Sequence, residues 1–287
     1  VADVMEKRRD ELCQLLTLEQ GKPLAQSHAE LTFSVSALHL AADQLPTIMP
    51  PAPSLADPHK RAFSELRPKG VYGIITPWNF PYSLPTCYYL GPGFAAGNAI
   101  VWVPAPSTSL VTVRLVECFQ DADPITDGML NLVLGEGPEA GDALVTHGGV
   151  DALAFTGSTK TGHTIASRAG AKPLAMELGG NGPTIVFNDA DIESAAAKSA
   201  VAAFTNAGQI CTSTERVLVQ YDAYERYLEF ATREAQAMKL GNPFDESTTL
   251  GPLHNEETAR KVDTHIADAT QTGGRITFGG GRGSDLP

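Results

Sequence analysis

Apolar positions recur at helical spacing near the start of the chain and in short runs between turn signals further along. Residues 2–20 carry Val4, Met5, Leu12, Leu15 and Leu16 at such spacing, and Gly21 and Pro23 mark the end of this predicted helix. A second helix is predicted over residues 24–45. Short apolar runs typical of strands follow at 71–76, 99–103, 130–134, 152–155, 173–177, 184–187 and 216–219.

Segments with helical patterns lie between these strand-like runs. They predict helices over 83–97, 108–119, 138–147, 159–169, 191–206, 224–238 and 258–270, with Asp191 as a helix N-cap. Gly91-Pro92-Gly93 is expected to interrupt the first of them. Alternating strands and helices of this length predict an α/β fold, in which helices cover both faces of a parallel sheet. Residues 46–58 are expected to form a linker or surface loop, and residues 279–287 a glycine-rich loop.

Composition and charge narrow the choice of partners. A formal net charge of −12 over 287 residues argues against a nucleic-acid partner and against docking on an anionic membrane. No apolar run is long enough to span a bilayer. The four cysteines lie far apart without a CxxC pair, and the seven histidines form no HxxxH or HExxH pair. We therefore expect no metal, reduced thiols and a cytoplasmic location.

Three turn segments carry side chains suited to covalent catalysis. Asn79 lies between prolines in residues 77–81, Glu177 precedes Leu178-Gly179-Gly180, and Cys211 lies in residues 208–212. Taken singly, each has a structural explanation: a turn asparagine, a solvated glutamate and a buried apolar cysteine. Together they provide an amide donor, a base and a thiol.

The surroundings of the cysteines separate Cys211 from the others. Cys13, Cys87 and Cys118 lie within apolar helical patterns and are expected to be buried. Cys211 lies on a turn between a helix and a strand, where a thiol is exposed enough to react. Tyr82, Tyr88 and Tyr89, which follow the Asn79 segment, are expected to pack in the core, although they are also candidates for a substrate entrance.

A glycine-bounded turn follows the strand at 152–155. Thr156-Gly157-Ser158-Thr159-Lys160-Thr161-Gly162 opens a helix whose N-terminal amides are suited to binding a pyrophosphate. The segment is neither a GxGxxG fingerprint nor a P-loop, so an ordinary strand-to-helix turn is the alternative.

These motifs, in this order, resemble those of the aldehyde dehydrogenase superfamily, in its non-acylating branch. The resemblance rests on residues 77–81, 155–159, 177–180 and 208–211, and Gly21-Lys22-Pro23 and Leu250-Gly251-Pro252 also have family counterparts. It implies a Rossmann-like parallel-sheet dinucleotide-binding domain over residues 1–178, followed by a partial α/β catalytic domain over residues 179–287. It also implies truncation at both ends, exposed core faces, an exposed sheet edge, and a homo-oligomer in the full-length protein.

The resemblance also assigns roles to individual residues. Cys211 is the expected nucleophile, the Asn79 side chain and the Cys211 amide form the oxyanion hole, and Glu177 is the base that activates water. The expected activity is oxidation of a small-molecule aldehyde to a carboxylic acid, with hydride transfer to NAD or NADP. The expected cofactor-binding residues are Thr76, Pro77, Trp78, Val103, Gly137, Phe155, Gly157, Ser158, Thr161 and Leu178.

Two departures from the family pattern leave an alternative open. Val103 stands where the family usually has a lysine that reaches the adenosine ribose, and Pro106 stands where an acidic residue is often found. The choice between NAD and NADP therefore remains open. Because the chain is short for the family, we expect little or no turnover from it in isolation. The alternative function is a truncated, non-catalytic relative that serves as a dinucleotide-binding or subunit-interaction module.

Overall fold

The computed structural model describes residues 1–48, 59–122 and 125–283. Most of the predicted linker at 46–58 and the last four residues of the predicted glycine-rich loop lie outside the described residues. The chain divides into two compact units. The first comprises Val1–Leu12 and Glu30–Leu178, and the second comprises Cys13–Ala29 and Gly179–Pro287.

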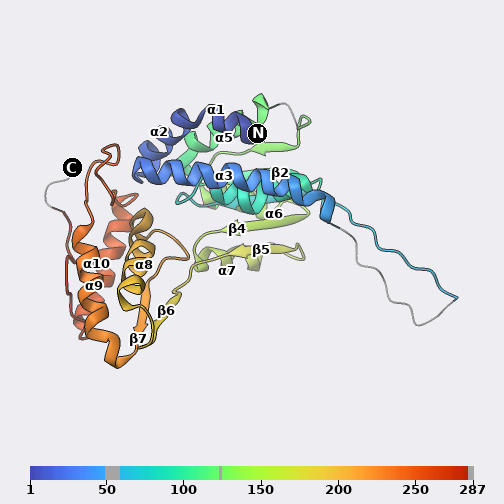
Figure 1. Cartoon of the computed structure of the whole chain (residues 1–287). Helices are drawn as coiled ribbons and strands as arrows, with labels where there is room; N and C mark the ends of the chain where they lie inside the picture. Colours follow the sequence, from blue (N-terminus) through green and yellow to red (C-terminus); the bar gives the residue numbers. More distant parts are fainter. Residues whose placement is uncertain (49–58, 123–124, 284–287) are drawn as a thin grey trace. The chain divides into compact units, whose positions relative to one another are not determined.

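The first unit is built on a five-stranded parallel sheet with the strand order β3-β2-β1-β4-β5 (Figure 1). The strands are β1 (Val71–Thr76), β2 (Ala99–Pro104), β3 (Leu130–Leu132), β4 (Ala152–Thr156) and β5 (Leu174–Glu177). The predicted parallel α/β sheet is confirmed. The chain builds outward from β1 through β2 to β3 and then returns to the other side of β1 as β4, so the order reverses at the β1–β4 pair. Ligands of open α/β sheets bind outside the carboxyl ends of the strands at such a reversal.

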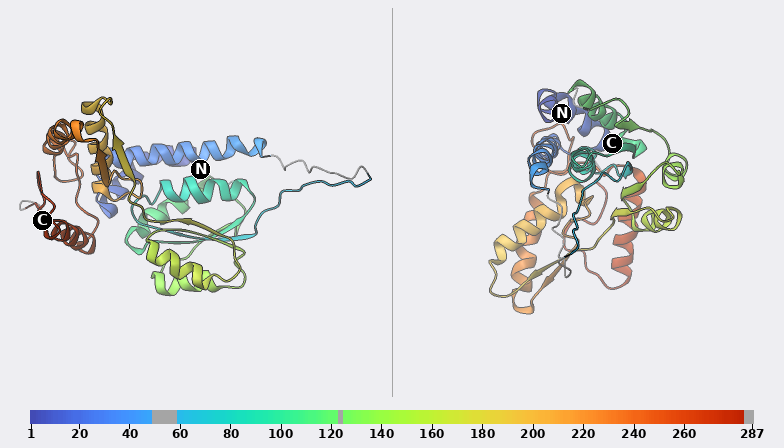
Figure 2. Two further views of the ribbon diagram at one scale, coloured as in Figure 1. Left: turned by 90° about the horizontal axis from the view of Figure 1, so that it is seen from below. Right: turned by 90° about the vertical axis from the view of Figure 1, so that its right-hand side faces the viewer.

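Helices cover both faces of this sheet (Figure 2). The helical elements of the first unit are α1 (Ala2–Lys7), η2 (Pro85–Leu90), α4 (Gly91–Ala95), η3 (Pro106–Thr108), α5 (Ser109–Asp121), η4 (Gly137–Gly141), α6 (Asp142–Thr146) and α7 (Thr159–Arg168). One face buries Ile100 and Trp102, and Gly93 of α4 lies directly over Ile100. The opposite face buries Leu153 and Phe155 against α6 and α7.

Two predicted helices differ from the structure. The helix expected over residues 2–20 is divided at Arg8 into α1 and α2 (Arg9–Gln20), because Arg8 leaves helical geometry with φ −99° and ψ 14°. The interruption expected at Gly91-Pro92-Gly93 is wrong. There the chain passes from the π-helical turn η2 into α4, and Pro92 lies in the first turn, where its missing N–H is tolerated. A Cβ on Gly91 would lie 2.8 Å from the Thr86 carbonyl oxygen, so glycine serves close packing here.

The second unit contains a short parallel pair, β6 (Pro183–Val186) and β7 (Arg216–Val219), together with helices α8 (Ile192–Phe204), α9 (Tyr224–Ala237) and α10 (Glu256–Gln271). Val186, Ile192 and Tyr227 belong to its core. The predicted cap of α8 is confirmed, because Asp191 Oδ1 accepts a hydrogen bond of 3.2 Å from the Ser194 amide. The short elements η1 (Leu45–Thr47), η5 (Thr205–Gly208) and η6 (Tyr221–Ala223) and the long helix α3 (Leu24–Gln44) complete the two units.

Residues 13–29 are tied to the segment at 239–254. The Leu24 amide donates to the Pro243 carbonyl oxygen at 2.9 Å. A Cβ on Gly251 would lie 2.4 Å from the Gly21 carbonyl oxygen, and one on Gly21 would lie 3.2 Å from Pro252 Cγ. The motifs Gly21-Lys22-Pro23 and Leu250-Gly251-Pro252 therefore pack on each other, and only glycine permits this approach.

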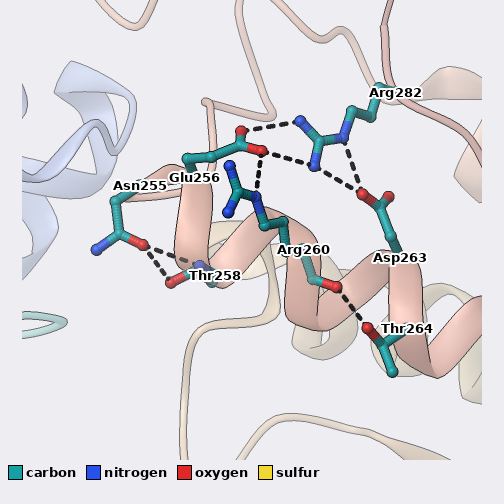
Figure 3. Close-up of polar contacts among 7 residues, drawn as sticks. All are labelled: Asn255, Glu256, Thr258, Arg260, Asp263, Thr264 and Arg282. Carbon is teal, nitrogen blue, oxygen red and sulfur yellow. Dashed lines mark hydrogen bonds and ion pairs between the residues drawn. The ribbon is translucent and has the colours of Figure 1, made fainter.

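The C-terminal segment is held against α10 by Arg282 (Figure 3). Its guanidinium binds the Glu256 carboxylate at 2.9 Å and the Asp263 carboxylate at 2.7 Å. The hydrogen bond from Arg282 and a further one from Arg260 lower the pKa of Glu256. Asn255 caps the helix by accepting from the Thr258 amide at 2.9 Å.

An apolar sheet face is exposed, as the resemblance predicts. Ile185 of β6 and Leu218 of β7 are neighbours in the register and have exposed fractions of 59% and 50%. Among the helices of the described ranges, none is both long enough and apolar enough to cross a bilayer.

Candidate active site

Two buried hydroxyl groups mark the carboxyl ends of β1 and β4, where the strand order reverses. Thr76 Oγ1 accepts a hydrogen bond of 2.9 Å from Trp102 Nε1, and the Thr156 hydroxyl is hydrogen-bonded to the Tyr89 hydroxyl. Burial raises the pKa of Tyr89 to about 12, and the nearby Glu177 carboxylate adds to the shift. These pairs hold the loops that follow both strands.

Asn79 lies half-buried in the turn that leaves β1, with Pro77 and Trp78. The buried Glu30 holds the chain just beyond this turn, because its Oε1 accepts hydrogen bonds from the amides of Tyr82 and Ser83 at 2.9 and 3.1 Å. Glu30 is not among the site residues predicted from the sequence, where its only signal is that it is a charged residue within the apolar pattern of α3. Burial of a carboxylate requires such partners.

Glu177 ends β5, and its side chain is exposed. Its carbonyl oxygen accepts a hydrogen bond of 3.0 Å from the Gly157 amide. Leu178, the next residue, packs against α7 so closely that a Cβ on Gly162 would lie 2.5 Å from Leu178 Cδ2. The end of β5 and the turn after β4 are therefore assembled together.

The start of α7 fits a dinucleotide pyrophosphate. Ser158 caps the helix by accepting from the Thr161 amide at 3.2 Å, and the hydroxyls of Ser158 and Thr161 lie 2.9 Å apart. A Cβ on Gly157 would lie 2.4 Å from Phe155 Cζ, so the turn needs glycine at this position. The helix N-terminus presents amides and a positive dipole end to an anion.

The other predicted cofactor-binding residues differ in character from this phosphate site. Val103 and Phe155 are buried in one apolar cluster. Val103 also borders a hollow of about 350 Å³ whose other walls include Val71, Val133, Leu144 and His147. Gly137, at the start of η4, faces open space, since no atom lies within 4 Å of where its Cβ would be. A valine wall offers no hydrogen bond to a ribose, in contrast to the lysine usual in the family.

Cys211 is an exposed thiol, as the sequence predicts. It lies on the turn between α8 and β7, beside the loop that leaves β5: a Cβ on Gly180 would lie 3.2 Å from the Cys211 carbonyl oxygen. Cys13 and Cys118 are buried as expected, whereas the prediction for Cys87 is wrong, because it is only half-buried. Burial raises the pKa of the Cys118 thiol, and partial burial raises that of the Cys87 thiol.

The tyrosines beyond Asn79 divide in the same way. Tyr82 and Tyr89 are buried as predicted, but Tyr88 has an exposed fraction of 52%. Tyr82, Thr86, Tyr89 and Leu90 are buried at positions i, i+4, i+7 and i+8, which form one face of a helix. Tyr88 and Cys87 lie between these positions, outside the buried face, so expecting all three tyrosines in the core ignores this period.

The predicted site residues fall into both compact units. Asn79, Glu177 and all ten predicted cofactor residues belong to the first unit, and Cys211 belongs to the second. In the first unit, the turns bearing Thr76, Gly157 and Glu177 gather at the carboxyl ends of neighbouring strands. Chemically, these residues include an exposed thiol, an exposed carboxylate and a capped helix N-terminus, groups suited to nucleophilic attack, proton transfer and anion binding.

Comparison with known proteins identifies the family and the fold. The aldehyde dehydrogenase family model matches residues 1–286. The mitochondrial succinate-semialdehyde dehydrogenase of Arabidopsis thaliana is 38% identical over 98% of this chain, which spans 53% of that protein. Two solved structures are each 34% identical over 99% of the chain. They are succinate-semialdehyde dehydrogenase from Burkholderia pseudomallei, with a TM-score of 0.95, and PnpE in complex with nicotinamide adenine dinucleotide, with a TM-score of 0.91.

The chain spans 59% and 58% of those two structures, so it corresponds to somewhat more than half of each. The family match extends over nearly its whole length, and the fold agrees throughout. The chain therefore belongs to the aldehyde dehydrogenase family.

Proposed function

We propose that this chain carries the catalytic residues of an NAD(P)-dependent, non-acylating aldehyde dehydrogenase. The observation that carries the proposal is the exposure of Cys211 on a turn beside Gly180, while Cys13 and Cys118 are buried. Asn79 and Glu177 support it, because each follows a strand at the carboxyl end of the sheet, where α/β folds bind their ligands.

The proposed residues divide the reaction between them. The Cys211 thiolate attacks the aldehyde carbon, and the new oxyanion accepts hydrogen bonds from the Asn79 amide and the Cys211 backbone N–H. A nicotinamide cofactor held at the start of α7 would accept the hydride whose loss converts this adduct on Cys211 into a thioester. Glu177 then takes a proton from water, which cleaves the thioester and releases the carboxylic acid and the thiol.

In the same proposal residues 1–178 bind the cofactor and residues 179–287 form part of the catalytic domain. Gly157 and Ser158 would hold the pyrophosphate at the start of α7, with Thr161 supporting the cap. Thr76, Pro77, Trp78 and Leu178 would line the cleft. Val103 would lie near the adenosine ribose, and Gly137 and Phe155 near the adenine and the phosphates. Since Val103 brings no charge to the ribose, we propose that NAD and NADP are both accepted.

Two substitutions test the catalytic roles. The measurement is aldehyde-dependent NAD(P)H formation by the complete protein that carries this chain, with succinate semialdehyde as the first substrate. Cys211→Ala is expected to abolish it, and Cys13→Ala serves as the matched control for loss of a thiol. Full turnover by the Cys211 variant would refute the proposal. Glu177→Gln is expected to preserve the first burst of NAD(P)H and slow the steady phase, because thioester hydrolysis comes after hydride transfer. Loss of the burst itself would assign Glu177 to an earlier step.

We further propose that the complete protein is a cytoplasmic homo-oligomer. The exposed pair Ile185 and Leu218 supports a subunit contact, since apolar sheet faces of this kind are usually covered. The four free cysteines suit a reducing compartment. Light scattering after size exclusion tests the oligomer, and a monomer at micromolar concentration would count against it.

A further inference from the structure

Three consecutive residues before the Cys211 segment have left-handed backbone geometry. Asn206 has φ 52° and ψ 32°, Ala207 has φ 54° and ψ 33°, and Gly208 has φ 75°. Among the described residues, Asn206 and Ala207 are the only non-glycine positions with positive φ. Left-handed geometry costs roughly 1–2 kcal/mol for a residue with a Cβ, so the surroundings must hold this turn in place.

Two glutamine side chains hold the first residue of the turn. Gln26 Oε1 accepts a hydrogen bond of 2.9 Å from the Asn206 amide, and Gln20 Nε2 donates one of 3.0 Å to Asn206 Oδ1. Gln20 is itself fixed, because its Oε1 accepts from the Lys22 amide at 2.9 Å. The exposed fractions of Gln20 and Asn206 are 1% and 2%, so the bonds of Gln20 are shielded from water, and the bond between Gln26 and Asn206 is partly buried. We call Gln20, Gln26 and Asn206 the amide clamp.

The turn is also fixed on the side of Cys211. Gln209 Nε2 donates to the Asn206 carbonyl oxygen at 2.8 Å, and Gln209 Oε1 accepts from the His254 amide at 3.0 Å. Beyond Cys211, the buried Ser213 hydroxyl donates to the Ala202 carbonyl oxygen at 3.0 Å. Cys211 is thus an exposed side chain on a backbone held at both ends by buried polar contacts.

We propose that Gln20 and Gln26 are positioning residues for Cys211. They act through Asn206: the amide clamp maintains the left-handed geometry of residues 206–208, and that geometry sets the direction in which the chain presents Cys211. That this positioning serves catalysis rests on the proposed function, whereas the fixing of residues 206–208 by the amide clamp does not. A displacement of about 1 Å at a reacting group lowers rates by about a hundredfold, so the clamp bears directly on the nucleophile.

Hydrogen–deuterium exchange of the 287-residue chain tests the hold on the turn. The amides of Asn206, Gln209, Ile210 and Ser213 are all hydrogen-bonded and report on it. Gln26→Leu removes the acceptor of the Asn206 amide, and exchange over residues 206–213 is expected to be about tenfold faster. Gln26→Glu keeps an acceptor oxygen at this place and is expected to restore slow exchange to within about threefold of the parent chain.

Gln14→Leu is the matched control, because Gln14 lies on the same helix as Gln20 with an exposed side chain. It should leave exchange over residues 206–213 unchanged. Gln20→Leu provides a second disruption of the clamp should Gln26→Leu not fold. Unchanged exchange over residues 206–213 in both folded leucine variants would overturn the proposal. So would equal acceleration in Gln26→Glu and Gln26→Leu, because the acceptor oxygen would then be irrelevant.

Kinetics separate this inference from the proposed function. In the complete protein, with aldehyde and NAD(P), Gln26→Leu is expected to lower the burst rate at least tenfold without changing KM for the cofactor, and Gln26→Glu to recover most of that rate. A fast-exchanging turn together with an unchanged burst would refute the positioning role. Full activity of the Cys211→Ala variant would instead refute the proposed function. The exchange data would still decide whether the amide clamp fixes the turn at residues 206–208.

Discussion

Replacing Ala207 with glycine should stabilise the protein, although the same change in a regular helix destabilises it. Ala207 has φ 54° and ψ 33°, a geometry in which Cβ crowds the following carbonyl. Removing Cβ relieves roughly 1–2 kcal/mol of this strain. Glycine loses about 0.5–1 kcal/mol more backbone entropy on folding than alanine does. The expected net gain in the free energy of unfolding is therefore about 0–1.5 kcal/mol, with a midpoint of about 0.75 kcal/mol.

Two further variants bracket the measurement. Ala197→Gly lies within α8 and should cost about 1 kcal/mol, because it changes only helix propensity and chain entropy. Gly208→Ala should also cost about 1–2 kcal/mol, because Gly208 has φ 75° and a Cβ there would lie 3.1 Å from the Ala203 carbonyl oxygen. Replacing alanine with glycine is thus expected to raise the free energy of unfolding at position 207 and to lower it at position 197.

The assay is equilibrium urea unfolding followed by circular dichroism, with the three variants measured beside the parent chain. A change in midpoint at constant slope reports stability. If Ala207→Gly destabilised the protein as much as Ala197→Gly does, the argument from left-handed strain would be wrong. If it stabilises the protein while the NAD(P)H burst slows, the strain contributes to the presentation of Cys211.

Three further outcomes are expected. Gly157→Ala should cost about 1–3 kcal/mol and weaken NAD binding in calorimetry, because its Cβ would collide with Phe155; Gly148→Ala, which faces open space, should change neither. Burial lowers the pKa of the His254 imidazole below its ordinary value of about 6.5. The free energy of unfolding therefore falls as the pH drops below about 6.5, because the unfolded chain takes up a proton there that the folded chain binds less well. His254→Asn should show a smaller loss in urea unfolding. Arg282→Ala should accelerate chymotryptic cleavage near Phe278, because it removes the contacts to Glu256 and Asp263; unchanged cleavage would mean that other contacts hold this segment.

The strands could be predicted well because their signal is local. Residues 71–76 coincide with β1, and residues 216–219 coincide with β7. Each is a short apolar run bounded by turn residues, and period-2 burial on a sheet needs no knowledge of distant contacts. The break at Arg8 and the helical course through Gly91-Pro92-Gly93 could not be predicted. The break at Arg8 lacks a proline or glycine signal. The helical course through Gly91 depends on its packing against Ala41, since a Cβ on Gly91 would lie 3.1 Å from Ala41 Cβ.

The chemical residues of the candidate site could be proposed from motifs, but their support could not. Cys211, Glu177 and Asn79 are chemically conspicuous beside glycine and proline. The supporting contacts join residues far apart in the chain, such as Glu30 with Tyr82 and Gln26 with Asn206. No local pattern pairs a glutamine with an asparagine 180 positions away. The positive φ of Ala207 could not be predicted either, because an alanine in the sequence usually indicates a helix.

The packing of Gly21 on Gly251 also constrains the order in which the chain can fold. Gln26 and Thr249, which lie beside this contact, are hydrogen-bonded across 223 positions. Closing a loop of that length costs about 5 kcal/mol of chain entropy before any contact is gained. During synthesis, residues 13–29 must therefore wait until residues 239–254 have emerged before they find these partners. We expect a slow, late step in refolding, and we expect residues 179–287 alone, without that early segment, to remain incompletely folded.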